Sequence, residues 1–454
     1  MNGNSVTQPL AEFTIKALHG ERNITIPFDG PVKIIVAENG YGKTTILNML
    51  HALLFDNYSK LRATKFDSIS LKFKSGVSVV LDKTDFSMNF QQVPQSGVFL
   101  HLNKLLGSDL LIEIFEDYRR LPRTEFGASL YLKPALEAVH RHFPGIAAEG
   151  LIQWLEMFSN ELGNALLYGP KLLEARDTIR NEFPFEPIYL PTYRRIEEDL
   201  KNFTGIPISP EIDKSAIQFG MTDVQASFKR ITTEIKDSSV QWFSKVSGQM
   251  LRQLIDGIKI TPEMQTGLED RDALKIVLAR IGDNMPEGDK EKILRLIESK
   301  EILTRNDVSL AYFLANLVKV YEQQKVNDNA IKQFTEKSNR YFGDKVVQYD
   351  QSAVEISIKR KKNGHDVSVN LLSSGEKQII SLFSRLFLGK PKRFAIFFDE
   401  PELSLSIEWQ RQLLPDIMDS GVCDFLFCTT HSPFIFDNDL TRYATGLDRY
   451  VEEL

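Results

Sequence analysis

Apolar residues near the start of the chain occupy every second position. They form two runs, Phe13 and Ile15, then Ile24, Ile26 and Phe28. This period of two predicts half-buried strands within residues 11–36. The same alternation returns over residues 69–81 on either side of Ser75-Gly76, which predicts a hairpin. We therefore expect residues 1–99 to form a lobe with a mixed sheet.

Other strands are predicted by short apolar runs that do not alternate. The segment 32–36 (Val-Lys-Ile-Ile-Val) precedes a helical pattern over residues 44–55. The runs 394–398 (Phe-Ala-Ile-Phe-Phe) and 425–428 (Phe-Leu-Phe-Cys) have no polar face, which is typical of strands buried on both sides. A shorter run at 188–190 predicts one more strand, which we expect to join the same sheet.

The middle of the chain has helical periodicity. Apolar residues recur at helical spacing over residues 100–183, between several prolines, and this predicts a helical insertion. Residues 201–343 are also mostly helical. Over residues 310–341, the positions of one face recur largely at alternating intervals of three and four residues, as in the seam of a coiled coil. This spacing predicts a compact helical arm. The seam positions are Leu310, Phe313, Leu317, Val320, Gln324, Asn327, Ile331, Phe334 and Tyr341.

These patterns together predict an α/β protein whose core is interrupted by helical segments. Strand signals return between residues 346 and 369 and again in the last two buried runs. The predicted segments are an N-terminal lobe (1–99), a helical insertion (100–183), a core strand with a Tyr-Arg-Arg segment (184–200), a helical arm (201–343) and a C-terminal lobe (344–454).

Composition narrows the class of protein. The chain has 454 residues, enough for about two to four domains. No apolar run approaches the ~18 residues that span a bilayer, and the N-terminus lacks a secretion signal, so we expect a cytoplasmic protein. The two cysteines, Cys423 and Cys428, have no histidine at zinc-ligand spacing and are expected to be reduced core thiols. A net charge of −6 argues against a protein that coats nucleic acid by charge alone, but it does not exclude a local basic groove.

The loop between the strand at 32–36 and the following helix has the composition of a phosphate-binding loop. Residues 37–45 read Ala-Glu-Asn-Gly-Tyr-Gly-Lys-Thr-Thr. Glycines let backbone N–H groups approach phosphates at a helix N-terminus, Lys43 would reach the β- and γ-phosphates, and Thr44 would give its hydroxyl to Mg²⁺. The candidate ligands are Asn39, Gly40, Tyr41, Gly42, Lys43, Thr44 and Thr45.

One position of this loop departs from the pattern G-x-x-x-x-G-K-[ST]. Ala37 stands in place of the first glycine. The alanine costs little if its φ angle is negative. The competing interpretation is a chance Gly-Lys-Thr in an ordinary loop.

Two acids end the buried run at 394–398. Carboxylates at the carboxyl end of a buried strand lie where open α/β sheets bind ligands, and burying them without a cation or water would be costly. Asp399 is placed to hold Mg²⁺, and Glu400 to orient or deprotonate a water that attacks a phosphate. The alternative is an acidic turn that only ends the strand.

Three other groups of polar residues allow both a functional and a structural interpretation. Arg194 and Arg195 follow the strand at 188–190 and would either bind a γ-phosphate or pair with Glu197 or Glu198. His431 ends the run at 425–428 and is placed to hydrogen-bond a γ-phosphate, although a lone histidine is usually structural. The basic run 359–362 sits at an expected hairpin tip, either as a solvated turn or as a DNA-backbone contact. His140 and His142 cannot share a helix face and are expected at the surface.

These motifs, in this order, resemble those of the ABC-type ATPases related to the SMC, RecF and OLD families. The matching parts are the Walker A loop (37–45), the signature (Leu372, Ser373, Ser374, Gly375 and Glu376), the Walker B strand with its catalytic Glu (394–400), the D-loop (about 403–406) and the switch His431. The resemblance covers the two ends of the chain. A Q-loop glutamine is not evident, with Gln91 and Gln92 as candidates and the segment 188–195 as an alternative equivalent.

The resemblance implies an ABC-type P-loop ATPase that uses ATP and Mg²⁺. It makes Glu400 and His431 catalytic, Thr44 and Asp399 metal-binding, and Ser373, Ser374, Gly375 and Glu376 nucleotide-binding. In these families two copies enclose the nucleotide, so Ser373 and Gly375 of one subunit would bind the γ-phosphate that Lys43 of the other holds. ATP would then stabilise a homo-oligomer.

Within this superfamily the chain is most similar to the PtuA family, the ATPases of Septu-type antiphage systems. The grounds are residues 189–197 (Tyr-Leu-Pro-Thr-Tyr-Arg-Arg-Ile-Glu), the Asp-Glu-Pro-Glu at 399–402, and the overall size. Residues 432–454 are too few for the Toprim nuclease domain of OLD-type proteins. The resemblance implies slow or regulatory ATP hydrolysis, no nuclease activity of its own, a separate HNH nuclease (PtuB-like) and DNA contact through the complex.

Two other functions stay open at this point. The chain would be a RecF-like DNA-repair ATPase if it clamped DNA without a nuclease partner. It would be an interaction scaffold if it bound ATP but hardly hydrolysed it.

Overall fold

The computed structural model has two compact units. It describes residues 8–38, 40–87, 97–120, 129, 131–144, 148–162, 168–191, 221–256, 261–281, 285–299, 302, 308–389 and 392–454. The first unit joins Met1–Gln218 to Pro391–Leu454, and the second is Phe219–Lys390. This division falls inside the predicted C-terminal lobe (344–454), because residues 391–454 pack with the start of the chain.

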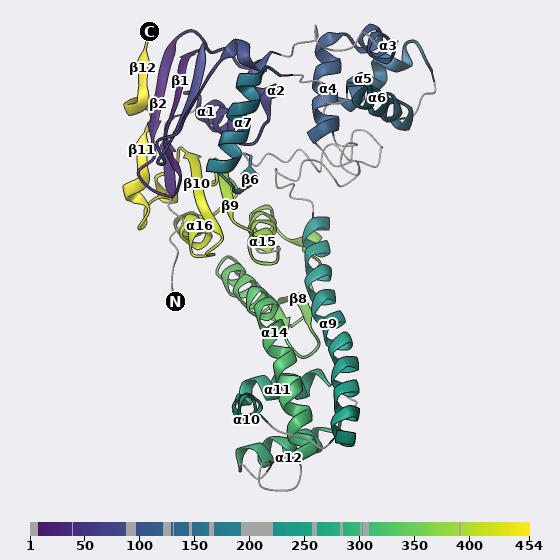
Figure 1. Cartoon of the computed structure of the whole chain (residues 1–454). Coiled ribbons are helices and arrows are strands. Elements are labelled where there is room, and N and C mark those ends of the chain that lie inside the picture. Colours follow the sequence, from purple (N-terminus) through teal and green to yellow (C-terminus); the bar gives the residue numbers. More distant parts are fainter. Residues whose placement is uncertain are drawn as a thin grey trace. The chain divides into compact units, whose positions relative to one another are not determined.

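An antiparallel sheet forms one layer of the first unit (Figure 1). Its order is β12-β2-β1-β4-β5. The strands are β1 (Leu10–Leu18), β2 (Arg22–Pro27), β4 (Ser68–Phe73), β5 (Ser78–Asp82) and β12 (Val451–Glu453). Gly76, in the turn between β4 and β5, has φ 91°, a conformation that favours glycine. The predicted alternating strands and the predicted hairpin are confirmed.

A five-stranded parallel sheet forms the second layer. Its order is β11-β3-β10-β9-β6, and each neighbouring pair is parallel. The strands are β3 (Val32–Val36), β6 (Glu186–Leu190), β9 (Phe394–Asp399), β10 (Cys423–Thr430) and β11 (Ala444–Gly446). Every residue of β9 and β10 is buried, as their apolar runs predict. The run at 188–190 joins the sheet beside β9, which confirms that expectation.

One hydrophobic core joins the two layers. It contains residues from both sheets and from α1 (Lys43–Leu54) and α7 (Pro170–Glu182). Figure 1 shows both helices beside the strands. Two further helices are α2 (Tyr58–Ala63) and α16 (Ile407–Met418). Short 3₁₀ helices lie at Lys83–Phe86, Pro433–Ile435, Thr441–Tyr443 and Leu447–Tyr450.

The predicted helical insertion has a core of its own. Its helices are α3 (Gly97–Leu106), α4 (Ser108–Arg120), α5 (Leu132–His140) and α6 (Ala148–Leu162). Arg62 of α2 reaches α4, where its guanidinium donates to Glu113 at 3.0 Å and to Glu116 at 2.8 Å. Burial raises the pKa of Glu116 against the opposing effect of this arginine. His140 and His142 are exposed, as predicted.

The second unit is mostly helical. Its helices are α9 (Met221–Asp256), α10 (Pro262–Leu268), α11 (Arg271–Arg280), α12 (Glu287–Glu298), α14 (Val308–Asn339), α15 (Ser374–Phe387) and a 3₁₀ turn at Val369–Leu371. Helix α14 packs against α9, α10, α11 and α15. A hairpin of β7 (Lys345–Asp350) and β8 (Glu355–Arg360) completes the unit.

The basic run 359–362 lies near its predicted place. It ends β8 and enters the turn between β8 and Asp366, where the hairpin tip was expected. The strand expected around Val367 is reduced to a single bridge between Lys359 and Asp366. Arg360 donates to Asp344 at 2.9 Å, and Lys361 donates to the carbonyl of Phe342 at 3.1 Å.

Six positions of the predicted seam are buried, and Leu310 and Phe313 are half-buried and pack against the same core. Asn327 is half-buried, whereas its neighbour Asp328, which the pattern did not include, is fully buried. Apolar periodicity alone cannot identify a buried carboxylate, because its burial depends on a cation from another helix. That cation is Arg280 of α11.

The Asp328 carboxylate is satisfied by a network of donors. Arg280 Nη2 donates to its two oxygens at 2.8 and 2.7 Å, and the Tyr349 hydroxyl donates to Oδ1. Arg280 Nη1 also donates to Gln324 at 2.6 Å, and Gln324 donates to Ser238 of α9 at 2.6 Å. Three helices and the hairpin therefore meet around one buried ion pair.

We predict that Arg280→Met destabilises the second unit by about 3–5 kcal/mol, because it leaves a buried carboxylate without its cation. The control is Arg295→Met. Arg295 forms an exposed pair with Glu291, and its loss should cost less than about 1 kcal/mol. Urea unfolding followed by helical circular dichroism measures both. Equal midpoints for the two variants would contradict the prediction.

Candidate nucleotide-binding site

The loop after β3 has the backbone geometry of a phosphate cradle. Gly40 has φ 90° and Gly42 has φ 86°, both left-handed, and the latter is the N-cap of α1. Apart from the adjacent residues, no atom of the described part of the chain lies within 4 Å of where a side chain would begin at either position, so the glycines leave open space above the loop. Ala37 does not have a positive φ angle. An alanine in place of the first glycine therefore costs little here, as expected.

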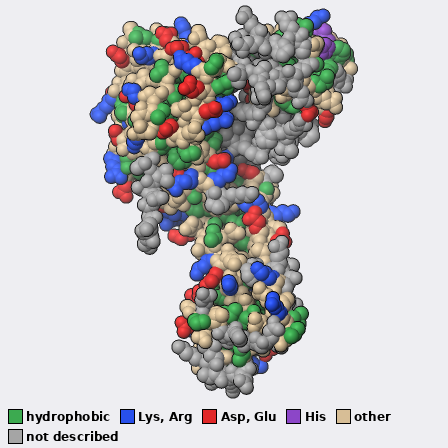
Figure 2. Space-filling view, in the orientation of Figure 1, with side chains coloured by type: hydrophobic (Ala, Val, Ile, Leu, Met, Phe, Trp, Pro, Cys, Tyr) green, Lys and Arg blue, Asp and Glu red, His purple; other side chains and the backbone are tan. Residues whose placement is uncertain are grey.

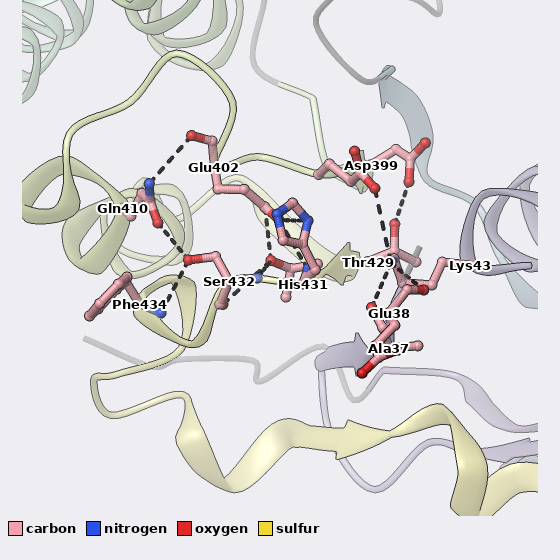
Figure 3. A network of polar contacts seen from close by, with 12 residues as sticks. Ala37, Glu38, Lys43, Asp399, Glu402, Gln410, Thr429, His431, Ser432 and Phe434 are labelled. Carbon is pink, nitrogen blue, oxygen red and sulfur yellow. Dashed lines mark hydrogen bonds and ion pairs between the residues drawn. The ribbon is translucent and has the colours of Figure 1, made fainter. Parts of the chain in front are cut away.

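Lys43 is buried at the base of this loop. Its Nζ donates to the carbonyl of Ala37 at 2.6 Å and to that of Glu38 at 3.0 Å, and it lies 4.0 Å from Glu400 Oε1 (Figure 3). The ammonium therefore sits inside the loop whose N–H groups would surround a phosphate. Thr44 and Tyr41 are exposed and Thr45 is half-buried. Asn39 lies outside the described residues.

Asp399 lies at the same edge of the parallel sheet. Its Oδ2 accepts a hydrogen bond from the Thr44 hydroxyl at 2.8 Å, and its Oδ1 accepts one from Thr429 at 2.6 Å. Thr44 follows β3, Asp399 ends β9, and Thr429 is in β10 between them. Strand order therefore brings together groups that are far apart in the sequence.

This oxygen pair fits Mg²⁺. Adjacent ligands of an octahedral magnesium at 2.0–2.1 Å lie about 2.9 Å apart, close to the observed Thr44–Asp399 spacing. Magnesium commonly takes one or two protein oxygens and completes its shell with phosphate and water. Among the described residues, no group of three or more His, Cys, Asp or Glu could hold a metal by itself.

Glu400 follows Asp399 in a strained conformation. Its φ of 51° is unusual for a residue with a side chain, and its N–H donates to the Thr429 carbonyl at 2.8 Å. Such strain concentrates at functional sites, where the surrounding structure holds it. The carboxylate is partly exposed and faces Lys43, so it can reach a water beside the loop.

Tyr189 of β6 also lies close to this edge. Burial raises its pKa, and the negative charge of Asp399 raises it further. The phenol therefore stays neutral and adds no charge beside the Asp399 carboxylate.

Glu402 is a residue whose contacts the sequence did not predict. This buried carboxylate accepts hydrogen bonds from the Thr430 hydroxyl at 2.8 Å and the His431 N–H at 3.0 Å, and its Oε1 lies 2.8 Å from His431 Nδ1 (Figure 3). Thr429 was missed as well. The available signal was a pair of threonines at the end of an otherwise apolar strand.

The signature residues lie in the second unit, at the start of α15. The Ser373 hydroxyl accepts from the Glu376 N–H at 3.4 Å, and the Glu376 carboxylate accepts from the Ser373 N–H at 2.8 Å. This is a capping box, as the Ser-x-x-Glu spacing permits. Lys345 pairs with the buried Glu376 at 3.1 Å. Ser373 is exposed, Ser374 is half-buried and Gly375 is buried.

Several predicted residues lie outside the described part of the chain. They are Arg194, Arg195, Gln91 and Gln92. Cys423 and Cys428 are buried and free, and burial raises the pKa of both thiols. Within the described helices, none is both long and apolar enough to span a membrane.

The strand order, glycine loop, buried lysine and strand-end carboxylate define a P-loop nucleotide-binding core. Protein-family comparison agrees. Residues 278–437 match the model described as "AAA domain, putative AbiEii toxin, Type IV TA system", and residues 13–99 match one described as "AAA domain". These two stretches of the chain thus match AAA-type ATPase domains, and such domains bind nucleotide.

Comparison with curated proteins gives no match. Two solved structures align with most of the chain. One is the Smc head domain with an extended coiled coil bound to the C-terminal domain of ScpA from Pyrococcus furiosus, with 13% identity, coverage of 98% of this chain and 96% of that one, and TM-score 0.35. The other is the Smc head domain with a coiled coil and joint from Pyrococcus yayanosii, with 14% identity, coverage of 94% and 93%, and TM-score 0.30. Both scores are low, so the fold assignment rests on the geometry above.

We predict that Lys43→Ala weakens ATP binding by about 10- to 100-fold, since a hydrogen bond to a charged group contributes roughly 1.5–3 kcal/mol. Titration calorimetry measures the affinity. The control is Lys33→Met. Lys33 lies in β3 and is buried like Lys43, but its ammonium donates to the Tyr450 hydroxyl and not to the loop. That variant should lose stability and keep its affinity. Equal ATP binding by wild type and Lys43→Ala would exclude this loop as the phosphate site.

We predict that Glu400→Gln slows ATP hydrolysis by about 100-fold or more while ATP still binds, because the amide cannot take a proton from water. A phosphate-release assay measures the rate. Glu408→Gln removes an exposed carboxylate from α16 and should leave the rate unchanged. If Glu400→Gln hydrolyses ATP at the wild-type rate, the water-activating group lies elsewhere.

Proposed function

We propose that this chain is an ABC-type ATPase that binds and hydrolyses ATP and forms a homo-oligomeric platform that regulates an associated HNH nuclease in antiphage defence. The observation that carries the ATPase part is the 2.8 Å contact between Thr44 and Asp399, which joins the loop after β3 to the end of β9. The nuclease-regulating part is supported by the sequence resemblance to the PtuA family.

Each residue at the sheet edge has a role in this proposal. The N–H groups of residues 40–45 and the Lys43 ammonium bind the phosphates, and Thr44 and Asp399 hold Mg²⁺. Bound magnesium would neutralise phosphate charge. Glu400 receives a proton from the attacking water, and His431 faces the γ-phosphate. The burial of Lys43 and Asp399 keeps water away from these charges and strengthens their interactions.

The signature residues support the proposed oligomer. Ser373, Ser374, Gly375 and Glu376 begin a helix, and a helix N-terminus favours a negatively charged ligand. By resemblance, this end of α15 in one copy meets the γ-phosphate held by Lys43 in another. ATP would then bind between two copies, and its hydrolysis would release them. We propose that turnover is slow and serves regulation.

The net charge and the face shown in Figure 2 support DNA contact through a complex. Figure 2 shows cationic and anionic side chains interspersed over the face in view, and the net charge is −6. Tight DNA binding needs several lysines or arginines gathered along the phosphate backbone. We therefore assign DNA cleavage to the nuclease partner, and we propose that this assembly works in the cytoplasm.

We predict that an HNH nuclease encoded beside this chain co-purifies with it and that ATP changes its DNA cleavage. Co-expression, affinity purification of the tagged ATPase and a plasmid-cleavage assay with and without ATP provide the measurement. Tight DNA binding by the ATPase alone, with a steep salt dependence, would instead indicate the RecF-like function. Absence of a nuclease in the purified complex would contradict the proposed partner.

The same preparation tests the oligomer. In a Glu400→Gln background with ATP, Ser373→Arg should block dimer formation in light scattering and leave nucleotide binding intact, because the bulky cation obstructs the interface. Ser373→Ala is the matched control, since it also loses the cap hydrogen bond, which costs about 1 kcal/mol, but adds no bulk. Dimers of Ser373→Arg would exclude the α15 N-terminus from the interface.

A further inference from the structure

We propose that Glu402 is a positioning residue for His431: it holds the imidazole with Nδ1–H directed at the carboxylate and Nε2 directed outward. This inference rests on the proposed ATPase function, because it assigns how His431 meets the phosphate or the attacking water. Glu402 is two residues beyond Glu400, in the Asp-Glu-Pro-Glu segment, and no role followed for it from the sequence pattern.

Both oxygens of the Glu402 carboxylate are met by neighbouring groups. Oε1 accepts from the His431 N–H at 3.0 Å and lies 2.8 Å from Nδ1 of the same residue, while Oε2 accepts from Thr430 at 2.8 Å. Glu402 is only 6% exposed. A buried carboxylate is tolerated when donors satisfy it, and here three donors from two consecutive residues do so.

The imidazole itself is not buried. The His431 side chain is 43% exposed, so one edge of the ring is fixed against protein and the other is open. A histidine that only filled the core would place both nitrogens inside. The arrangement resembles a carboxylate that orients a reactive histidine by binding its second nitrogen.

A second contact holds the same two loops together. Gln410 of α16 accepts from the Ser432 hydroxyl at 2.7 Å and donates to the carbonyl of Leu405 at 3.1 Å and to that of Glu402 at 3.4 Å. The loop after β9 and the loop after β10 are therefore joined on both sides of His431 (Figure 3).

The backbone of the loop after β9 makes this support necessary. Glu400 has φ 51° and Ser404 has φ 67°, so two residues with side chains are held in left-handed conformations on either side of Glu402. Such conformations persist when surrounding contacts impose them. The hydrogen bonds of Glu402 and Gln410 supply contacts of that kind.

The ring orientation determines the chemistry available at Nε2. An ionised carboxylate can only accept, so Nδ1 must carry the hydrogen. In the neutral ring Nε2 is then an acceptor, able to receive a hydrogen bond or a proton from water. It donates to a phosphate oxygen only when the ring is an imidazolium. Glu402 thereby excludes the neutral form that would donate from Nε2.

The substitution that tests this removes the acceptor for Nδ1–H and keeps a side chain of similar size. Glu402→Leu leaves nothing to hold the hydrogen on Nδ1, so the opposite neutral tautomer, with hydrogen on Nε2, becomes accessible. We expect kcat for ATP hydrolysis to fall about tenfold or more, with KM changed less than about twofold, because the wrong tautomer affects the chemical step. In His431→Ala, adding Glu402→Leu should lower kcat no further.

A second measurement does not depend on hydrolysis. Side-chain ¹⁵N correlation spectra of the full chain labelled on its seven histidines distinguish the two tautomers, and His431→Ala assigns the His431 signal by difference. Wild type should show the Nδ1–H form, and Glu402→Leu should lose it in favour of the Nε2–H form. Thr430→Val removes only the donor to Oε2 and should keep the wild-type form.

The outcomes separate this inference from the proposed function. An Nε2–H signal in wild type, or an additional loss of kcat when Glu402→Leu is added to His431→Ala, would overturn the positioning role. A wild-type chain that neither binds nor hydrolyses ATP would contradict the ATPase proposal, while the nucleotide-free spectra would still test the geometry. Glu402→Leu with an unchanged signal and reduced thermal stability would show a structural carboxylate only.

Discussion

The first unit depends on a parallel sheet that brings the end of β3 and the end of β9 to the same edge. The hydrogen bond from the Thr44 hydroxyl to the Asp399 carboxylate forms at that edge. The two residues are 355 positions apart, and their oxygens lie 2.8 Å from each other. This contact exists because β3, β10 and β9 are parallel neighbours, so their carboxyl ends meet at one edge. The helical insertion and the second unit are accommodated in the long interval between these strands without interrupting the sheet.

The same edge concentrates buried charge that the fold must compensate. Lys43 is satisfied by loop carbonyls, Asp399 by two threonine hydroxyls and Glu402 by donors from β10 and the loop after it. Each would destabilise an apolar core if unpaired. Groups of the neighbouring loops and strand ends compensate these charges. Phosphate or metal would therefore enter a site whose charged groups are already oriented, with little reorganisation.

Local patterns predicted most of the strands, the glycine loop and the acids at the end of β9, because periodicity and turn chemistry are properties of short segments. They did not reveal that β10 separates β3 from β9, since strand order is set by packing. Asp328 was missed for a related reason: its burial depends on Arg280 from another helix. The contacts of Glu402 likewise depend on residues 430 and 431, which lie beyond a whole helix and strand. The functional roles of the site residues remain predictions.

We propose that one Mg²⁺–nucleotide binds where these strand ends meet. A structure determined with Mg²⁺ and a non-hydrolysable ATP analogue would test this proposal. We expect the triphosphate over residues 40–45, with the metal in contact with the oxygens of Thr44 and Asp399. A nucleotide bound at another place, or a metal coordinated without Asp399, would contradict it.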